Sequence, residues 1–188
     1  MCAPMVVALY AIPRLIAGLG DDRFGLLSIV WMLVGYFSIF DLGLGRALTK
    51  TVAERLGTGR SHEVPGVFWT AFAVMVALGA LGGLLVYGVA PWIAERTVRS
   101  VPELLPETLR SFRAVAFGLP MLITITGLIG TLEACHRFPL INAVRIPTGA
   151  FTFLGPLLVL PFSTSLHAVV LVLLAGRLVE WLIFFVCC

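Results

Sequence analysis

A few ionisable side chains interrupt long apolar stretches of this sequence, and their presence there requires an explanation. Arg14 follows Pro13 inside the first apolar run, and Asp41 lies at the end of the second run, beside Gly43 and Gly45. An ionised side chain near the centre of a bilayer costs about 3 kcal/mol on insertion scales. We therefore expect Arg14 and Asp41 to face inward and to serve a function. We also expect Pro13, Gly43 and Gly45 to break the helices beside them.

Further charged residues lie near the ends of later apolar runs. They are Arg46 and Lys50, the group Glu133, His136 and Arg137, then Arg145, and finally Arg177 and Glu180. Arg177 and Glu180 are three residues apart, so on a helix they share a face and can form an ion pair. Lys50, Arg137 and Arg145 have a simpler interpretation, because long cationic side chains near helix ends reach the membrane surface and anchor the helix. Both interpretations stay open at the level of the sequence.

The composition explains why each of these charges matters. The chain has 188 residues, of which 60% are hydrophobic and only 12% are charged. A soluble domain usually carries about 25% charged residues, so an ordinary soluble fold is excluded. The abundance of Leu, Val, Ile and Phe excludes disorder. The net charge of +3 is small and the arginines are scattered, which leaves no basic face for nucleic acid. The composition indicates a polytopic membrane protein.

The sequence predicts no enzyme. It contains no nucleophile elbow, no paired catalytic carboxylates and no soluble domain that could hold an active site. The four cysteines lack the spacing of metal ligands. Gly43 and Gly45 do not begin a dinucleotide-binding fingerprint, because Leu48 stands where its last glycine belongs. We predict neither a resident metal nor a cofactor.

Gaps between the charges predict the helices. About 20 apolar residues cross roughly 30 Å of hydrocarbon as a helix. No segment alternates apolar and polar residues as a barrel strand in a membrane must, so the chain is predicted to be an all-α helical bundle. We predict one transmembrane domain over residues 1–188 with about six helices, at residues 3–19, 24–56, 65–93, 112–134, 140–160 and 166–186.

Two further patterns concern orientation and packing. The segment 46–60 carries four basic residues against one glutamate, so we place it on the cytoplasmic side. Gly79 and Gly83 are four residues apart, a spacing that lets two membrane helices approach closely. We expect this pair to serve packing inside the bundle rather than dimerisation.

Several segments make a family resemblance visible. Residues 24–27 and 35–49, the latter containing Asp41, Gly43, Gly45 and Arg46, resemble bacterial polysaccharide and O-antigen flippases. Residues 12–20 resemble the end of the first helix in that family, and residues 132–138 and 142–147 resemble its fourth-to-fifth helix turn. These flippases belong to the multidrug/oligosaccharidyl-lipid/polysaccharide superfamily. Full members carry about twice as many helices, so the chain resembles an amino-terminal half, and we expect it to be a fragment.

The resemblance implies a function and a set of site residues. It implies flipping of polyprenyl-diphosphate-linked oligosaccharides across the bacterial inner membrane by alternating access, without an enzymatic step. The candidates for binding the substrate head group are Arg14, Arg46, Arg145 and Arg177, and the candidates for coupling or gating are Asp41 and Glu133. The coupling ion would be H⁺ or Na⁺.

The implied partners are the lipid-linked oligosaccharide, membrane lipids, and a carboxy-terminal lobe or second subunit, with no nucleic acid. One lobe alone cannot rock around a site between two bodies, so transport requires that second part. Two alternatives stay open. The first is a multidrug-efflux transporter of the same superfamily, and the second is a membrane scaffold subunit that transports nothing.

Overall fold

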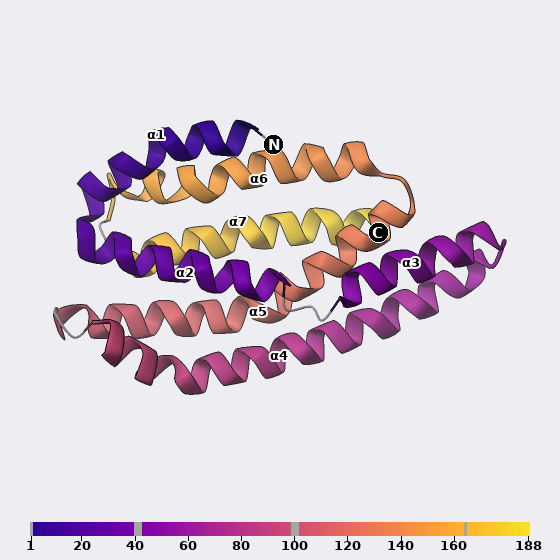
Figure 1. Ribbon diagram of the computed structural model, residues 1–188, viewed down its shortest axis with the longest axis horizontal. Coiled ribbons are helices and arrows are strands. Elements are labelled where there is room, and N and C mark those ends of the chain that lie inside the picture. Colours follow the sequence, from indigo (N-terminus) through magenta and orange to yellow (C-terminus); the bar gives the residue numbers. More distant parts are fainter. Residues whose placement is uncertain (1, 40–42, 99–101, 164) are drawn as a thin grey trace.

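The computed structural model is a bundle of helices, and it describes residues 2–39, 43–98, 102–163 and 165–188 (Figure 1). The α-helices are α1 (Cys2–Leu19), α2 (Asp21–Ile39), α3 (Leu44–Gly57), α4 (Val64–Thr97), α5 (Leu105–Ala134), α6 (Phe138–Val159) and α7 (Leu166–Cys187). Two single 3₁₀ turns, Ser61–Glu63 and Pro102–Leu104, precede α4 and α5. The described ranges contain no strand, which confirms the predicted all-α bundle.

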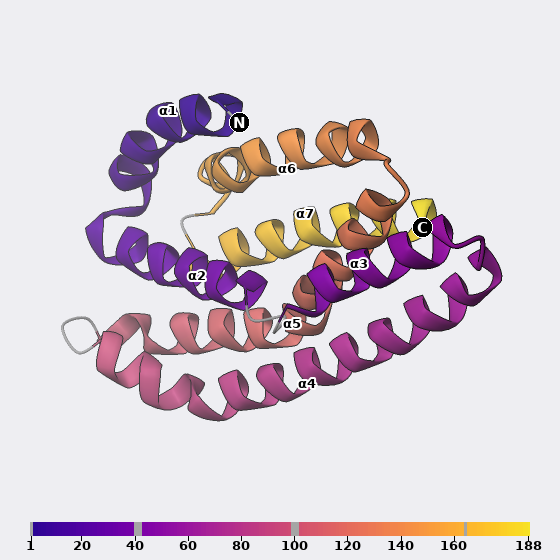
Figure 2. The same ribbon diagram turned by 45° about the vertical axis from the view of Figure 1, so that its right-hand side comes forward.

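The helices run back and forth along the long axis of the molecule (Figures 1 and 2). α5 lies at the centre and packs against α2, α3, α4 and α7, while α6 lies between α1 and α7. Of the most apolar window in α5, 67% is buried, against 22% in the corresponding windows of α4 and α7. Much of the apolar surface of α4 and α7 is therefore exposed in this chain, whereas α5 is the core helix.

Three helical segments are long and apolar enough to cross a membrane: residues 61–97, 102–134 and 166–187. These spans support a multi-pass membrane protein. These are the three such segments among the described residues, and the predicted number of about six crossings stays a prediction.

The predicted helix over 24–56 is divided in two. α2 ends at Ile39 and α3 begins at Leu44, directly after Gly43, whose φ of 77° lies in the left-handed region. A residue with a Cβ is strained in that conformation, so the glycine makes the change of direction possible. Asp41 lies outside the described residues. Gly45 lies buried inside α3, so it does not break the helix as predicted.

The helix break expected at Pro13 is not observed. α1 is continuous from Cys2 to Leu19 with Pro13 inside it. A proline removes one helical hydrogen bond, but membrane helices tolerate it because neighbouring groups and small backbone adjustments satisfy the freed carbonyl.

The glycine pair on α4 packs against α5. A Cβ built on Gly79 would lie 2.4 Å from the Cα of Pro120, and one built on Gly83 would lie 2.6 Å from the carbonyl oxygen of Ala116. Only glycine allows the two backbones to come this close. The expected use of this pair inside the bundle is therefore observed.

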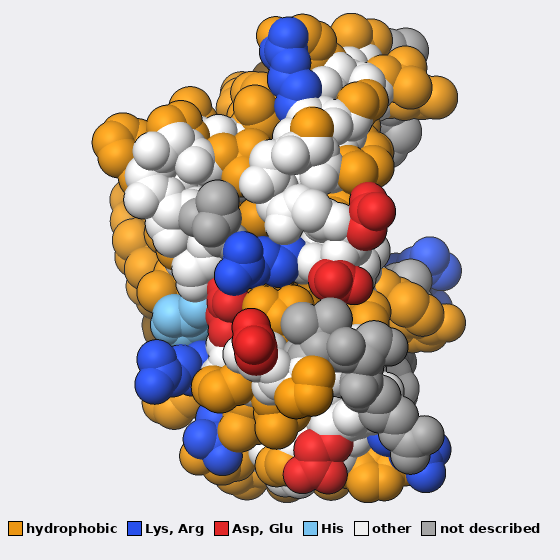
Figure 3. Space-filling model, turned by 90° about the vertical axis from the view of Figure 1, so that its left-hand side faces the viewer, with side chains coloured by type: hydrophobic (Ala, Val, Ile, Leu, Met, Phe, Trp, Pro, Cys, Tyr) orange, Lys and Arg blue, Asp and Glu red, His pale blue; other side chains and the backbone are white. Residues whose placement is uncertain are grey.

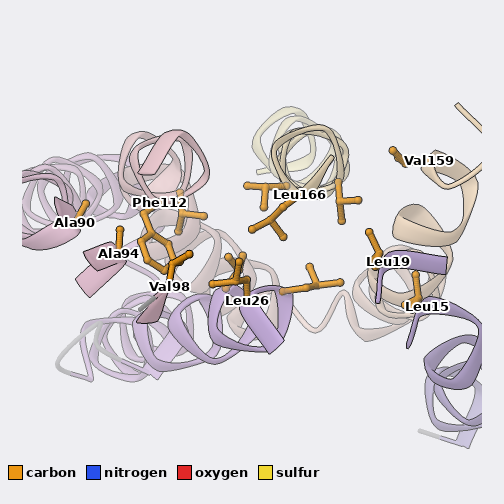
Figure 4. Close-up of a cluster of buried hydrophobic side chains, with 14 of the residues drawn as sticks. Leu15, Leu19, Leu26, Ala90, Ala94, Val98, Phe112, Val159 and Leu166 are labelled. Atoms are coloured by element: carbon orange, nitrogen blue, oxygen red, sulfur yellow. The ribbon is translucent and has the colours of Figure 1, made fainter. Parts of the chain in front are cut away.

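One end of the bundle is closed by an apolar cluster (Figure 4). The labelled side chains come from α1, α2, α4, α5, α6 and α7 and from the residue after α4; they are Leu15, Leu19, Leu26, Ala90, Ala94, Val98, Phe112, Val159 and Leu166. Side chains from six helices meet here with almost no exposed surface. The opposite end of the bundle is built differently, because it contains a charged pocket.

Candidate functional site

A charged pocket lies between α3, α5, α6 and α7, in the half of the bundle away from the apolar cluster. Its lining residues are Gly45, Arg46, Thr49, Ile125, Thr126, Ile129, Gly130, Glu133, Arg145, Arg177 and Glu180, and its volume is about 230 Å³. Four of the six charged residues selected from the sequence therefore meet here, although they come from four different helices. We call this the charged pocket.

Close packing of α3 on α5 positions the first wall of the charged pocket. A Cβ on Gly130 would lie 2.6 Å from the hydroxyl oxygen of Thr49 and 2.7 Å from the carbonyl oxygen of Gly45. The Thr49 hydroxyl in turn donates a hydrogen bond to the Gly45 carbonyl, at 2.9 Å. The backbones of α3 and α5 are thus in contact at this point, and Arg46 stands beside that contact at the rim of the pocket.

An ion pair forms the second wall. The Nη1 atom of Arg177 lies 2.8 Å from Oε2 of Glu180 and donates a hydrogen bond to it. The Glu180 side chain is 3% exposed and that of Arg177 is 31% exposed. This confirms the predicted pairing across three residues of one helix. The buried carboxylate depends on its partner, because a buried charge without a counter-charge is strongly unfavourable.

The other three charged side chains of the pocket have no such partner. Arg46, Arg145 and Glu133 form no hydrogen bond or ion pair with any side chain in the part of the chain that the structure describes. Three arginines and two glutamates line the pocket, so positive charge is in excess by one. Attraction between opposite charges grows as water is removed, and the pocket is therefore suited to an anionic group.

Two exposed tryptophans on α4 have a spacing close to the thickness of the bilayer. Trp69 is 55% exposed and Trp92 is 56% exposed. They are 23 residues apart; on a helix that separation is about 35 Å, close to the roughly 30 Å of the hydrocarbon layer. Tryptophan is enriched at both membrane surfaces. The positions of Trp69 and Trp92 thus fit two membrane interfaces.

The charged pocket reaches below the Trp69 interface. The Phe72 ring of α4 lies 6.4 Å from the Trp181 ring of α7, and the two helices run in opposite directions (Figure 1). Phe72 is one turn below Trp69, and Arg177 is one further turn below Trp181, which places Arg177 about 10 Å inside the interface. The Arg177–Glu180 pair is therefore not a surface ion pair.

Of the predicted site residues that the structure describes, Arg14 is not part of the charged pocket. Arg14 is exposed on α1, where its guanidinium carbon lies 3.6 Å from the centre of the Tyr10 ring. Asp41 lies outside the described residues. The roles predicted for both therefore stay predictions.

Sequence reasoning did not select Glu180, Thr49 or Thr126 for the site, although all three line the pocket. The three-residue spacing between Arg177 and Glu180 already indicated that Glu180 shares a helix face with Arg177, so Glu180 could have been selected. The two threonines carried no signal, since hydroxyls bonded to the preceding turn are common in membrane helices.

At the end of the bundle that holds the apolar cluster, charged side chains connect helices to one another. The carboxylate of Glu107 on α5 accepts a hydrogen bond from the backbone N–H of Leu166 at the start of α7, and it lies 3.7 Å from Nη2 of Arg23 on α2. Figure 3 looks onto this end, where acidic and basic side chains lie next to each other. Here one carboxylate ties three helices together, so these charges serve the structure.

Comparison with known proteins identifies the family. The MatE family model matches residues 5–146, which is most of the chain. The chain belongs to the MatE family. The MatE match includes Arg46, Glu133 and Arg145 and ends before the ion pair of α7. Membership confirms the resemblance to the multidrug/oligosaccharidyl-lipid/polysaccharide superfamily.

One curated relative is a protein of Shigella flexneri named "Putative O-antigen transporter". It is 28% identical over 183 residues, an alignment that covers 93% of this chain and 43% of the relative. The MatE chain thus spans less than half the length of this relative. No solved structure matches the present chain.

Proposed function

We propose that this MatE chain is one lobe of a flippase that moves polyprenyl-diphosphate-linked oligosaccharides across the bacterial inner membrane. In this proposal the diphosphate occupies the charged pocket, and a second lobe or subunit completes the transport path. The observation that carries the proposal is the position of Arg46 and Arg145, which face one pocket without ion-pair partners among the described residues. The printed name of the Shigella relative supports the same class of substrate.

The chemistry of the proposed step follows from the charges. A guanidinium group donates two parallel hydrogen bonds to a phosphate, so Arg46 and Arg145 together can hold a diphosphate from two sides. Arg177 is already paired with Glu180. In this proposal it therefore adds to the electrostatic potential of the pocket but does not itself donate hydrogen bonds to the diphosphate. Binding of the anion then supplies the counter-charge that the two free arginines lack.

Glu133 is the proposed coupling group. It is half-buried in the charged pocket and has no ion-pair partner among the described residues. A carboxylate beside a bound diphosphate is repelled by it, so uptake of H⁺ or Na⁺ at Glu133 would favour head-group binding. Rocking of this lobe against the second one would then expose the pocket to either side of the membrane.

The multidrug alternative fits the charged pocket less well. A lipophilic cation would meet an excess of arginine over glutamate there. A scaffold subunit also explains less, because it gives no role to Arg46 and Arg145, two exposed arginines that face one pocket.

A flipping assay tests the proposal. The full-length protein is reconstituted in vesicles with a fluorescent polyprenyl-diphosphate oligosaccharide, and accessibility of the sugar on each leaflet is followed. We expect Arg46→Ala and Arg145→Ala to abolish flipping without changing membrane insertion. Arg60→Ala is the control, since Arg60 is exposed and, among the described residues, its side chain bonds only to the Thr58 hydroxyl. Flipping at the wild-type rate in both pocket variants would refute the proposal.

A further inference from the structure

An apolar groove lies between α6 and α7. It has a volume of about 480 Å³ and is lined by Ala143, Val144, Pro147, Thr148, Phe151, Ala175, Gly176, Val179, Glu180 and Ile183. All of these side chains are apolar except Thr148 and Glu180. Its volume falls within the range of about 300–1,000 Å³ that is usual for pockets of small ligands. We call it the α6–α7 groove.

The groove and the charged pocket meet at Glu180. Arg177 faces the charged pocket, Val179 and Ile183 face the groove, and Glu180 lines both. We call the line of contact between α6 and α7 the α6–α7 seam. A small cavity of about 30 Å³ borders both sides of this seam, because it is lined by Arg177 of the charged pocket as well as by Thr148 and Gly176 of the groove. The seam between α6 and α7 is thus thin at this level, with an apolar space on one side and a charged space on the other.

Small residues and a proline create the groove. Ala143 and Pro147 on α6 and Ala175 on α7 are exposed, so no described helix covers them. The two helices approach each other at Gly176, where a Cβ would lie 2.6 Å from Cδ1 of the Phe151 ring. Beside this contact, the short side chains of Ala143 and Ala175 leave space for the groove.

We propose that the α6–α7 groove holds the hydrocarbon chain of the lipid-linked substrate while its diphosphate lies in the charged pocket. The substrate would straddle the seam at Glu180. This inference rests on the proposed function, because it takes the charged pocket as the head-group site. It adds a route by which an amphiphile enters from the side, between α6 and α7.

Charge and polarity on the two sides select this occupant. The charged side offers Arg46 and Arg145 to an anion, and the groove side offers a mainly apolar surface to a chain. Hydrocarbon that leaves lipid for an aqueous pocket loses about 0.8 kcal/mol per CH₂ group, so a long prenyl chain must stay in an apolar environment throughout transport. An amphiphile with an anionic head satisfies both surfaces at once.

A photo-crosslinking experiment tests the groove directly. Benzoylphenylalanine replaces Val179, which lines the groove, or Leu178, its neighbour on α7, which is 47% exposed and lines neither space. The full-length protein is placed in vesicles of zwitterionic phospholipid that contain a radiolabelled polyprenyl diphosphate. We expect position 179 to capture several-fold more labelled lipid than position 178.

Two outcomes would overturn the inference. Equal labelling at positions 178 and 179 would mean that the groove holds only bulk lipid. Crosslinking of position 179 to protein, without labelled lipid, would mean that another lobe or subunit covers the groove.

A variant in which the groove is filled distinguishes failure of this inference from failure of the proposed function. In Ala143→Phe the added ring occupies the groove, and Ala77→Phe is the control because Ala77 is exposed on α4 outside both spaces. We expect Ala143→Phe to weaken binding of a long-chain polyprenyl diphosphate and to leave binding of a short-chain prenyl diphosphate unchanged. If Arg46→Ala weakens binding of both ligands while Ala143→Phe weakens neither, the groove inference fails and the head-group site stands. If Arg46→Ala has no effect on either ligand, the proposed function fails.

Discussion

The α4–α5 seam and the α6–α7 seam both contain glycines, and each borders an apolar groove of about 480 Å³, but they differ in what the glycines touch. We call the α4–α5 seam closed because its glycines lie against backbone, and the α6–α7 seam open because Gly176 lies against a side chain. At the α4–α5 seam, the space beside Gly79 and Gly83 is filled by the backbone of α5. At the α6–α7 seam, Gly176 faces a side chain, the Phe151 ring, and the seam then opens into the groove and the charged pocket. Two backbones in contact leave no room for an added carbon, whereas the end of a side chain can shift to accept one. The unpartnered arginines lie beside the open seam.

The largest effect is expected from breaking the ion pair at the open seam. Arg177→Leu leaves Glu180, whose side chain is 3% exposed, without its counter-charge, and removing one partner of a buried pair costs about 3–5 kcal/mol. The stability of the protein is measured by reversible unfolding in mixed detergent micelles. The double variant Arg177→Leu/Glu180→Leu should recover most of the lost stability, because two apolar groups replace the pair. A single variant as stable as the double one would contradict this.

The closed seam should not tolerate one added carbon. Gly79→Ala forces a methyl group against Pro120, and overpacking of this kind destabilises by about 1–3 kcal/mol. Gly88→Ala is the matched control on the same helix, since nothing lies within 4 Å of its added Cβ. It should stabilise by about 0.5–1 kcal/mol, because alanine favours the helix. If the two variants behave alike in the same unfolding assay, backbone contact does not close this seam.

The open seam should tolerate the same change better. Gly176→Ala pushes on the Phe151 ring, which borders empty space on both sides, so we expect a loss of about 1 kcal/mol, at the low end for overpacking. Combining it with Phe151→Leu should remove most of that loss, as the coupling between touching residues predicts. A loss for Gly176→Ala that equals that of Gly79→Ala would remove the contrast between the seams.

The smallest effect is expected from the hydrogen bond that links α7 to α5. The indole N–H of Trp181 on α7 donates a hydrogen bond to the Thr124 hydroxyl on α5, at 2.9 Å. Hydrogen bonds between membrane helices contribute about 0.6 kcal/mol on average, so Thr124→Val should cost about that much. The Trp181 fluorescence spectrum should shift at the same time. A change in stability without a spectral shift would mean that Thr124 acts through another contact.

The sequence predicted the class of fold and selected four residues that line the candidate site, for one physical reason: charges inside apolar runs are costly and require an explanation. Arg46, Glu133, Arg145 and Arg177 were selected on that ground, together with the family resemblance, and they line one pocket. The faces of the helices could not be predicted, because buried and lipid-facing positions are equally apolar. The sequence therefore could not show that Arg14 lies outside the pocket and stacks on Tyr10.

Local breaks were predicted with mixed success for a related reason. Gly43 begins a new helix because its positive φ is a property of its own backbone. Pro13 and Gly45 lie inside continuous helices, since packing against neighbours decides whether such residues interrupt a helix.

Binding of a polyprenyl diphosphate to the full-length protein tests the central claim most directly. The dissociation constant is measured for the wild type, for Arg46→Ala/Arg145→Ala and for Arg46→Lys/Arg145→Lys. Each lost charge-assisted hydrogen bond is worth about 1.5–3 kcal/mol, so the alanine pair should weaken binding about a hundredfold or more. The lysine pair keeps the charge but loses the two-pronged geometry, and it should lie in between. An alanine pair that binds as tightly as the wild type would contradict the assignment of the charged pocket as the head-group site.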